Sequence, residues 1–184
     1  MTMTSADPLH TKFHGLLHDQ IRNEFAASQQ YIAIAVHFDG ADLPQLAGLF
    51  YRQAVEERNH AMMMVRYLLD RGVEVEIPGV DAVCTRFATP RDAIALALDL
   101  ERGVTEQIVA LAAAARDENE YLGEQFIGWF LKEQVEEVAS MTTLLNVAQR
   151  AGNDWFDVET YLAREDVGDG GGDASAPAAA GGGL

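Results

Sequence analysis

The segment around residue 57 combines a carboxylate and an imidazole at a spacing that suits metal binding. In Glu57-Arg-Asn-His60, the two ionisable residues are three positions apart, so in a helix they lie on one face. Carboxylate and imidazole groups bind iron, manganese and zinc. This pattern alone is weak evidence, because acidic helical chains often contain it by chance. Its meaning depends on what the rest of the chain places beside it.

Three other segments carry a polar residue in the middle of an otherwise apolar helical stripe. Followed at alternating steps of three and four, these stripes centre on Glu24, on Glu101, and on Gln134 with Glu137. The centres lie near the midpoints of the expected helices, so they should meet at one level of a bundle. Carboxylates this close repel one another as bare anions, and divalent cations would remove that repulsion. The residues therefore predict a di-metal site, with iron or manganese favoured over zinc.

The spacing of these residues also forms an internal repeat. The separation from Glu24 to Glu57 equals that from Glu101 to Gln134, which suggests two related helical hairpins. The second half is altered, because Glu137 stands where the repeat would place a histidine. We therefore expect an asymmetric site, in which one metal lacks an imidazole ligand and is held more loosely.

The elements that must position these residues are five expected helices. Four long helical patterns and one short pattern cover about residues 8–38, 43–71, 90–117, 120–151 and 153–165. Asp42 and Pro44 suit the start of the second helix, and Thr89 with Pro90 suits the start of the third. Alternating strand patterning is confined to residues 73–77. The predicted class is all-α.

The long connection over residues 72–89 decides the predicted topology. Its roughly 17 residues could reach ~55 Å when extended, whereas a 28-residue helix is only ~42 Å long. The second and third helices can therefore run parallel, while the short connections make the other neighbours antiparallel. The sequence predicts a four-helix bundle with one long crossover and a short fifth helix at the C-terminal end.

Composition limits the function classes. The 184 residues include 13 Lys and Arg against 29 Asp and Glu, a formal net charge of −16. This argues against nucleic acid and anionic membranes as partners, because both favour basic patches. The only cysteine, Cys84, excludes an intrachain disulfide and a thiolate metal cluster. We see no signal peptide and no apolar run long enough to span a membrane, so we expect a cytoplasmic location.

The two ends of the chain differ in composition. We expect residues 1–165 to form one domain and residues 166–184, rich in Gly and Ala, to be a flexible tail. Docking of the end of this tail is the alternative.

Several residues beside the stripes have two interpretations. Glu56, Glu133 and Glu136 flank the polar centres, and are either solvent-exposed charges or further metal ligands. Tyr31 lies on the same helix face as Glu24, where it would either pack or donate a hydrogen bond or an electron. Trp129 is most simply a core residue.

Taken together, these residues resemble a ferritin, and the mycobacterial type of bacterial ferritin most closely. The resemblance covers about residues 13–165 and rests on Glu24 with Tyr31, Glu56-Glu57-Arg-Asn-His60, Glu101 and the segment WFLKEQVEE at 129–137. It implies a homo-oligomeric cage of 24 subunits that oxidises Fe(II) with dioxygen and stores Fe(III) as mineral. Each subunit would use two irons at its oxidation centre.

The resemblance also implies roles for individual residues. Glu24, Glu57 and His60 would hold the first iron, and Glu57 would bridge to a second iron held by Glu101 and Glu137. These would be the principal ligands of the oxidation centre.

The remaining polar residues would act around that centre. Gln134 would orient water or dioxygen, and Tyr31 and Trp129 resemble the family's redox-active neighbours. Glu56, Glu133 and Glu136, together with Glu137, resemble a further iron site that supplies the pair or passes iron inward.

Arg58 marks a departure from the haem-binding relatives. Those relatives carry a methionine directly after the bridging glutamate, whereas this chain has Arg58, so the resemblance implies that no haem is bound. They also have a second Glu-x-x-His, which here reads Gln134-Val-Glu-Glu137.

Two other function classes remain open at this stage. A rubrerythrin-like peroxidase or another di-iron oxidase would use the same site without storing mineral, although such peroxidases usually add a cysteine-rich module. A purely structural assembly subunit would keep its central carboxylates protonated. Metal content separates a purely structural subunit from both iron-using functions. The mass of the assembly separates iron storage from a di-iron peroxidase or oxidase.

Overall fold

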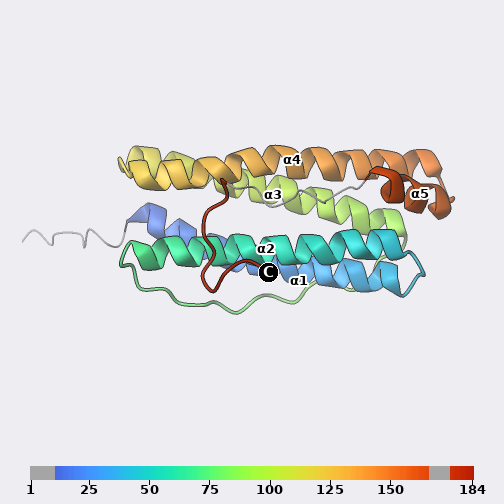
Figure 1. The fold of residues 1–184 in the computed structure, drawn as a ribbon, viewed down its shortest axis with the longest axis horizontal. Helices are drawn as coiled ribbons and strands as arrows, with labels where there is room; N and C mark the ends of the chain where they lie inside the picture. The colour runs from blue at the N-terminus through green and yellow to red at the C-terminus, as the bar shows by residue number, and fades with distance from the viewer. Residues whose placement is uncertain (1–10, 166–174) are drawn as a thin grey trace, which may run out of the picture.

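The computed structural model contains five helices and describes residues 11–165 and 175–184 (Figure 1). The helices are α1 Lys12–Asp39, α2 Pro44–Asp70, α3 Pro90–Asp117, α4 Tyr121–Ala151 and α5 Trp155–Glu165. The all-α prediction is confirmed, and among the described residues the segment 73–77 forms no strand. Its alternating residues lie in the extended connection between α2 and α3.

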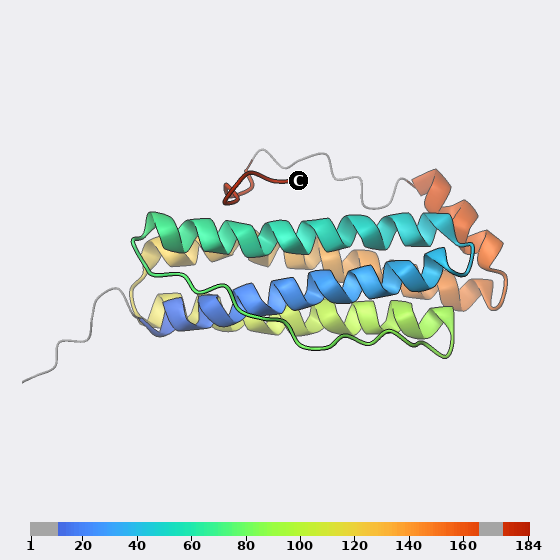
Figure 2. The ribbon, with the colours of Figure 1, turned by 90° about the horizontal axis from the view of Figure 1, so that it is seen from below.

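The four long helices form an up-down bundle with one crossover. α1 packs mainly on α2 and α3 mainly on α4, as the predicted hairpins require. The connection after α2 runs along the bundle from one end to the other, so α2 and α3 point the same way (Figures 1 and 2). The predicted topology is therefore confirmed. α5 lies across one end of the bundle, against α2 and α4.

The start of α1 and the cap of α2 differ from the prediction. α1 begins at Lys12 rather than near Pro8, because Thr11 is extended and its hydroxyl caps the backbone N–H of His14. Pro8 itself lies outside the described residues. Pro44 is the first residue of α2 as expected, but Asp42 is not its cap.

A residue from another helix caps α2. The carboxylate of Glu159 on α5 accepts the backbone N–H groups of Gln45 and Leu46 at 2.9 and 3.0 Å. Free N–H groups at a helix start favour a negative charge, so this contact fastens α5 to the bundle. The sequence pattern predicts a local cap, whereas the residue that caps α2 lies 113 residues or more along the chain.

The core is divided into two apolar clusters. One contains Phe38, Phe50 and Ile94 near the α5 end, and the other contains Phe13, Leu68 and Ile127 near the opposite end. The buried polar side chains lie between them. The sequence pattern of apolar helix ends and polar helix centres therefore reappears as two apolar cores separated by one polar layer.

The end of the tail lies against α2. The backbone N–H of Ala180 donates to the carbonyl oxygen of Met62 at 3.0 Å, and the N–H of Leu184 donates to Asn59 Oδ1 at 3.2 Å. In Figure 2 this segment lies outside the bundle, beside α2. Residues 166–174 are outside the described part of the chain, so the predicted flexibility of the tail stays a prediction.

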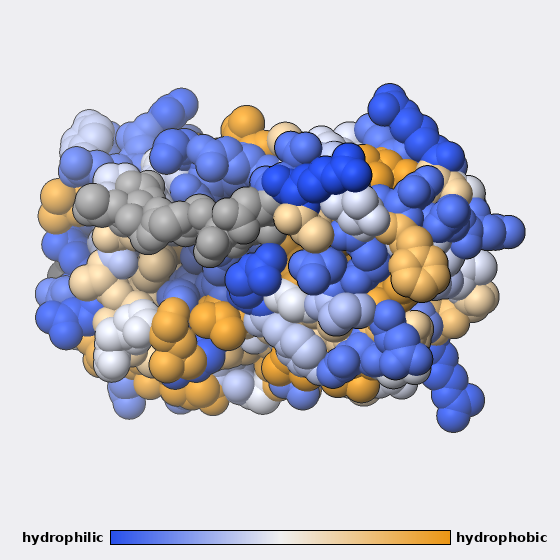
Figure 3. Space-filling view, turned by 45° about the vertical axis from the view of Figure 1, so that its right-hand side comes forward, coloured by the Kyte–Doolittle hydropathy of each residue, from blue (hydrophilic) through white to orange (hydrophobic). Residues whose placement is uncertain are grey.

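One face of the molecule is largely hydrophilic. Figure 3 shows one face on which hydrophilic residues dominate and hydrophobic residues are grouped at separate places between them. Within residues 11–165 and 175–184, no helix combines the length and the apolar character needed to cross a membrane.

Candidate metal centre

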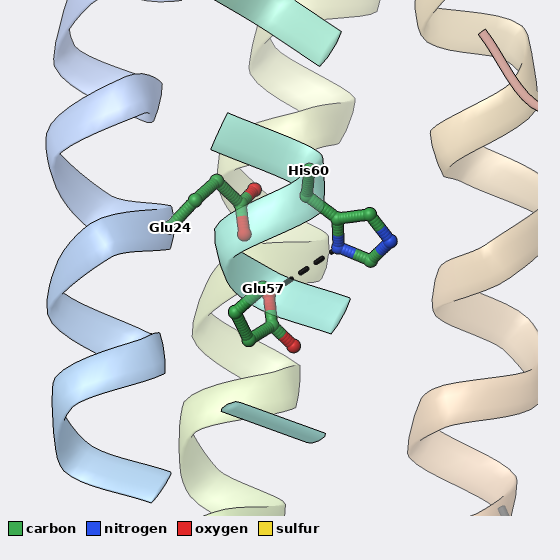
Figure 4. A group of neighbouring side chains, drawn as sticks. All are labelled: Glu24, Glu57 and His60. Carbon is green, nitrogen blue, oxygen red and sulfur yellow. Dashed lines mark hydrogen bonds and ion pairs between the residues drawn. The ribbon is translucent and has the colours of Figure 1, made fainter. Parts of the chain in front are cut away.

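Three buried side chains from two helices meet at the polar layer. Glu24 on α1 and Glu57 and His60 on α2 each offer a ligand atom within 4.8 Å of the other two (Figure 4). His60 Nδ1 lies 3.3 Å from Glu57 Oε2, the contact marked by the dashed line. The spacing of three residues places both groups on one face of α2, as the sequence predicted.

Glu101 brings α3 into the same layer. Its carboxylate accepts a hydrogen bond from the hydroxyl of Tyr31 on α1, and both side chains are buried. The charge of Glu101 acts on Glu57, and that of Glu24 acts on Glu101. Tyr31 also stacks on Phe50, with ring centroids 5.8 Å apart, so it both packs and donates a hydrogen bond.

Gln134 and Glu137 complete the layer from α4. Gln134 is buried, and its Oε1 lies 2.9 Å from the hydroxyl of Thr105 on α3. Glu137 is half-buried, and its charge acts on Glu57 and Tyr31. All four long helices therefore contribute a polar side chain at one level.

The electrostatics show that this layer is unfavourable without a cation. Burial raises the pKa of Glu24 and Glu57 well above the usual range, and nearby carboxylates raise them further. Burial also raises the pKa of Glu101 to about 7 and that of Glu137 to about 9. At neutral pH, the metal-free site therefore retains protons on carboxyl groups that bound cations would displace.

Unpartnered oxygens point to the same conclusion. Glu24 Oε2, Glu57 Oε1 and Glu101 Oε2 are buried and have no donor at ordinary hydrogen-bond distance among the described residues. A buried acceptor without a partner costs about 1–3 kcal/mol. Carboxylate oxygens with one imidazole fit iron or manganese in such a space. The donor set therefore fits hard divalent cations.

The three flanking glutamates occupy different environments. Glu56 is half-buried and accepts a hydrogen bond from Gln53. Burial raises the pKa of Glu56, and the charge of Glu133 raises it further. Glu136 is different, because its side chain is 68% exposed and lies 3.9 Å from Lys132 Nζ. The structure thus brings Glu56 and Glu133 near the layer and leaves Glu136 facing outward.

Three supporting residues were given no role at the site by the sequence pattern. Gln20 Nε2 donates to Glu24 Oε1 at 2.9 Å, Gln53 donates to Glu56, and Thr105 contacts Gln134. Gln20, Gln53 and Thr105 each lie four residues from a central glutamate on the same helix. That helical step is the signal that could have identified them.

His60 also contacts an aromatic cluster. Its ring centroid lies 5.7 Å from that of Trp129 and 5.6 Å from that of Phe130, both near edge-to-face. These rings hold the imidazole in place and close the layer on the α4 side. Trp129 is therefore a neighbour of the candidate ligand His60 as well as a packing residue.

A protein family and several individual proteins match this chain in sequence. The ferritin-like domain family matches residues 15–151. The chain is 68% identical to Ferritin BfrB of Mycolicibacterium smegmatis over 182 residues, covering 99% of this chain and all of that protein. It is 60% identical to Ferritin BfrB of Mycobacterium tuberculosis (strain Erdman) over 183 residues, covering 99% of this chain and all of the relative.

Solved structures show the same fold. An open pore ferritin from the hyperthermophilic archaeon Archaeoglobus fulgidus superposes with a TM-score of 0.80 at 27% identity, covering 84% of this chain and 96% of that one. The predicted ferritin-like bundle is confirmed by this match.

Proposed function

Because the chain belongs to the ferritin family and resembles its mycobacterial members, we propose that it oxidises Fe(II) with dioxygen and stores the Fe(III) as mineral. The observation that carries the proposal is the buried layer of carboxylates around His60, with acceptor oxygens that lack donors. Iron is the substrate of this site, and the mineral is its stored product.

The proposed chemistry follows from the ligand charges. Glu24, Glu57 and His60 bind one Fe(II), and Glu57 bridges to a second Fe(II) held by Glu101 and Glu137. Each Fe(II) gives one electron to dioxygen, and the anionic ligands stabilise Fe(III) more than Fe(II) because its charge is higher. The protons that the metal-free carboxyls retain leave when iron binds.

The neighbouring residues have supporting roles in this proposal. Glu56 and Glu133 bind a further iron on its way to or from the pair, and Glu136 receives iron at the exposed side. Tyr31 is placed to give an electron to the pair, with its phenolic proton passing to the hydrogen-bonded Glu101. No haem takes part, because Arg58 occupies the position that would carry the haem methionine.

A homo-oligomeric cage of 24 subunits is the proposed storage form. The outer faces of α1 and α2 carry large apolar side chains that are exposed in the single chain, among them Ile32, Val36, Tyr51 and Val55. Apolar groups gathered on neighbouring helices favour contact with another protein surface. Such contacts between copies would enclose the cavity in which mineral accumulates.

The test combines iron oxidation with the mass of the assembly. The purified protein should oxidise Fe(II) rapidly in air, while Glu57→Gln should be slow and Glu106→Gln, an exposed glutamate on α3, unchanged. Native mass spectrometry should show an assembly many times larger than the 20.1 kDa chain, with iron retained inside. Rapid oxidation by a small species that retains no iron would support a di-iron oxidase instead. Absence of both iron binding and oxidation would reject both functions.

A further inference from the structure

Thr105 links the two helices of the second hairpin at the level of the metal layer. It lies on α3, one turn after Glu101, and is half-buried. Its hydroxyl oxygen is 2.8 Å from the backbone carbonyl oxygen of Glu101 and 2.9 Å from Oε1 of Gln134 on α4. Nothing in the expected ligand pattern gives this threonine a role.

The single hydroxyl proton of Thr105 can be donated to only one of these two oxygens. A hydroxyl carries one proton, and both neighbouring oxygens are acceptors. The carbonyl of Glu101 already accepts the helical N–H of Thr105 within α3, whereas Gln134 Oε1 is buried and has Thr105 as its nearby donor. Leaving a buried acceptor unpaired is unfavourable, so the hydroxyl proton goes to Gln134.

The orientation of the Gln134 amide follows from this hydrogen bond. With its oxygen held by Thr105, the two N–H donors of its nitrogen are turned away from that hydroxyl and remain available to the polar layer. The opposite orientation would place the amide oxygen against the carboxylate of Glu101, and two buried acceptors would then face each other.

We propose that Thr105 is a positioning residue that holds Gln134 so that it presents N–H donors, and not an oxygen ligand, to the iron site. This inference rests on the proposed function. Dioxygen gains negative charge as it accepts electrons from the two irons, and preorganised N–H donors stabilise such charge. Gln134 would therefore act on dioxygen and Glu101 without binding iron.

Kinetics of matched variants test the role of the hydroxyl. Thr105→Val keeps the shape and removes the donor, and should lower kcat for Fe(II) oxidation about 10-fold while changing the apparent KM for Fe(II) less than twofold. Thr105→Ser retains the donor and should restore the rate. Thr143→Val, an exposed threonine on α4, is the control and should match the parent. Equal rates for Thr105→Val and the parent would overturn the proposal.

A double-mutant cycle tests whether Thr105 acts through Gln134. Gln134→Leu should lower kcat by at least as much as Thr105→Val, and the double variant should be no slower than Gln134→Leu alone. Losses that multiply in the double variant would show that Thr105 acts independently, which contradicts a positioning role.

Anaerobic titration with Co(II) gives a measurement that does not depend on oxidation. Gln134→Leu should bind Co(II) with the affinity and visible spectrum of the parent, because Gln134 is not a ligand. A tenfold or greater loss of affinity for one Co(II) would overturn the inference about Thr105 and Gln134 but would leave the proposed function intact. A parent that binds Co(II) but does not oxidise Fe(II) would overturn the proposed function alone, and a parent that binds no Co(II) would overturn both.

Discussion

Each buried carboxylate of the polar layer is unfavourable as a bare anion, and its neighbours in the layer add to that cost. Glu24, Glu57 and Glu101 are almost completely buried, and burial raises the pKa of each. In the proposed function this cost is offset, because the same oxygens, once ionised, would bind cations strongly in a buried site. At the scale of single residues, stability and function therefore oppose each other.

Removal of the imidazole should test the first iron position. His60→Ala should slow the initial oxidation of Fe(II) on the order of 10-fold or more, because one ligand of the first iron is lost. Stopped-flow absorbance in the first turnover measures this. The assembly should still form, because the proposed contacts between subunits involve the outer helix faces and not His60. Native mass spectrometry checks this. His37→Ala, on α1 outside the layer, is the control, and an unchanged first turnover for His60→Ala would show that the site is misplaced.

Glu101 should make the stability of the metal-free protein depend on pH. Its pKa is about 7 in the fold against an ordinary 4.5, so the folded state binds more protons and stability falls as pH rises between these values. Glu101→Gln removes this effect. It should stabilise the metal-free protein at pH 8 by on the order of 1–3 kcal/mol, with no such gain at pH 4.5.

Calorimetry in the presence of a chelator measures that difference at the two pH values. Glu106→Gln, exposed on the same helix, should shift the melting temperature little at either pH. An equal shift for Glu101→Gln at pH 4.5 and pH 8 would mean that titration of Glu101 is not the cause.

At the scale of the elements, close packing sets where α4 meets α1. A Cβ on Gly123 would lie 2.5 Å from Cε1 of Phe13, a fully buried ring in the first turn of α1. The first turn of α1 is also fastened to the α3–α4 turn, because Glu118 accepts the backbone N–H groups of Lys12 and Phe13 at 2.9 Å. This end of the bundle therefore leaves no room for a side chain at Gly123.

A pair of glycine substitutions on α4 should separate packing from helix propensity. Gly123→Ala should destabilise the protein by about 1–3 kcal/mol, because Phe13 must move from a well-packed position. Gly128→Ala meets nothing within 4 Å and should stabilise by up to about 1 kcal/mol. Denaturant unfolding of both variants measures this, and shifts of the same sign would contradict the argument.

Element positions were largely predictable from the sequence. Thr89 forms the expected cap of α3, since its hydroxyl accepts the N–H of Asp92 and Asp92 caps in return. The start of α1 and the cap of α2 were not predictable in this way, because Pro8 is compatible with a helix and Glu159 reaches α2 only after the chain has folded.

At the scale of the whole molecule, the end of the tail packs on the outside of the bundle, against α2. Its last residue is held by the side chain of Asn59, which accepts the N–H of Leu184 and donates to its oxygen at 3.5 Å. Gly181 and Gly182 have positive φ values of 79° and 83°, a conformation that other residues adopt with strain. These glycines allow the chain to turn back onto α2.

Asn59→Ala should loosen that contact. The backbone amide of Leu184 should then exchange with solvent at least several-fold faster, because it loses its acceptor. Hydrogen exchange with mass spectrometry of the C-terminal peptide measures the change. Asn146→Ala, exposed on α4, should leave exchange as in the parent. Unchanged exchange in Asn59→Ala would show that the tail is not held there in solution.

The sequence by itself determined which polar residues gather in the bundle and the level at which they meet. Helical periodicity is local, and helices of similar length in an up-down bundle bring their midpoints together, so Glu24, Glu57 and Glu101 could be placed from spacing alone. Only the tertiary structure decided the pairs between helices, such as Thr105 with Gln134 and Tyr31 with Glu101. Hydrogen bonds require atoms to be placed within a few tenths of an ångström, which depends on the rotation and axial shift of each helix, and an apolar stripe leaves both undefined.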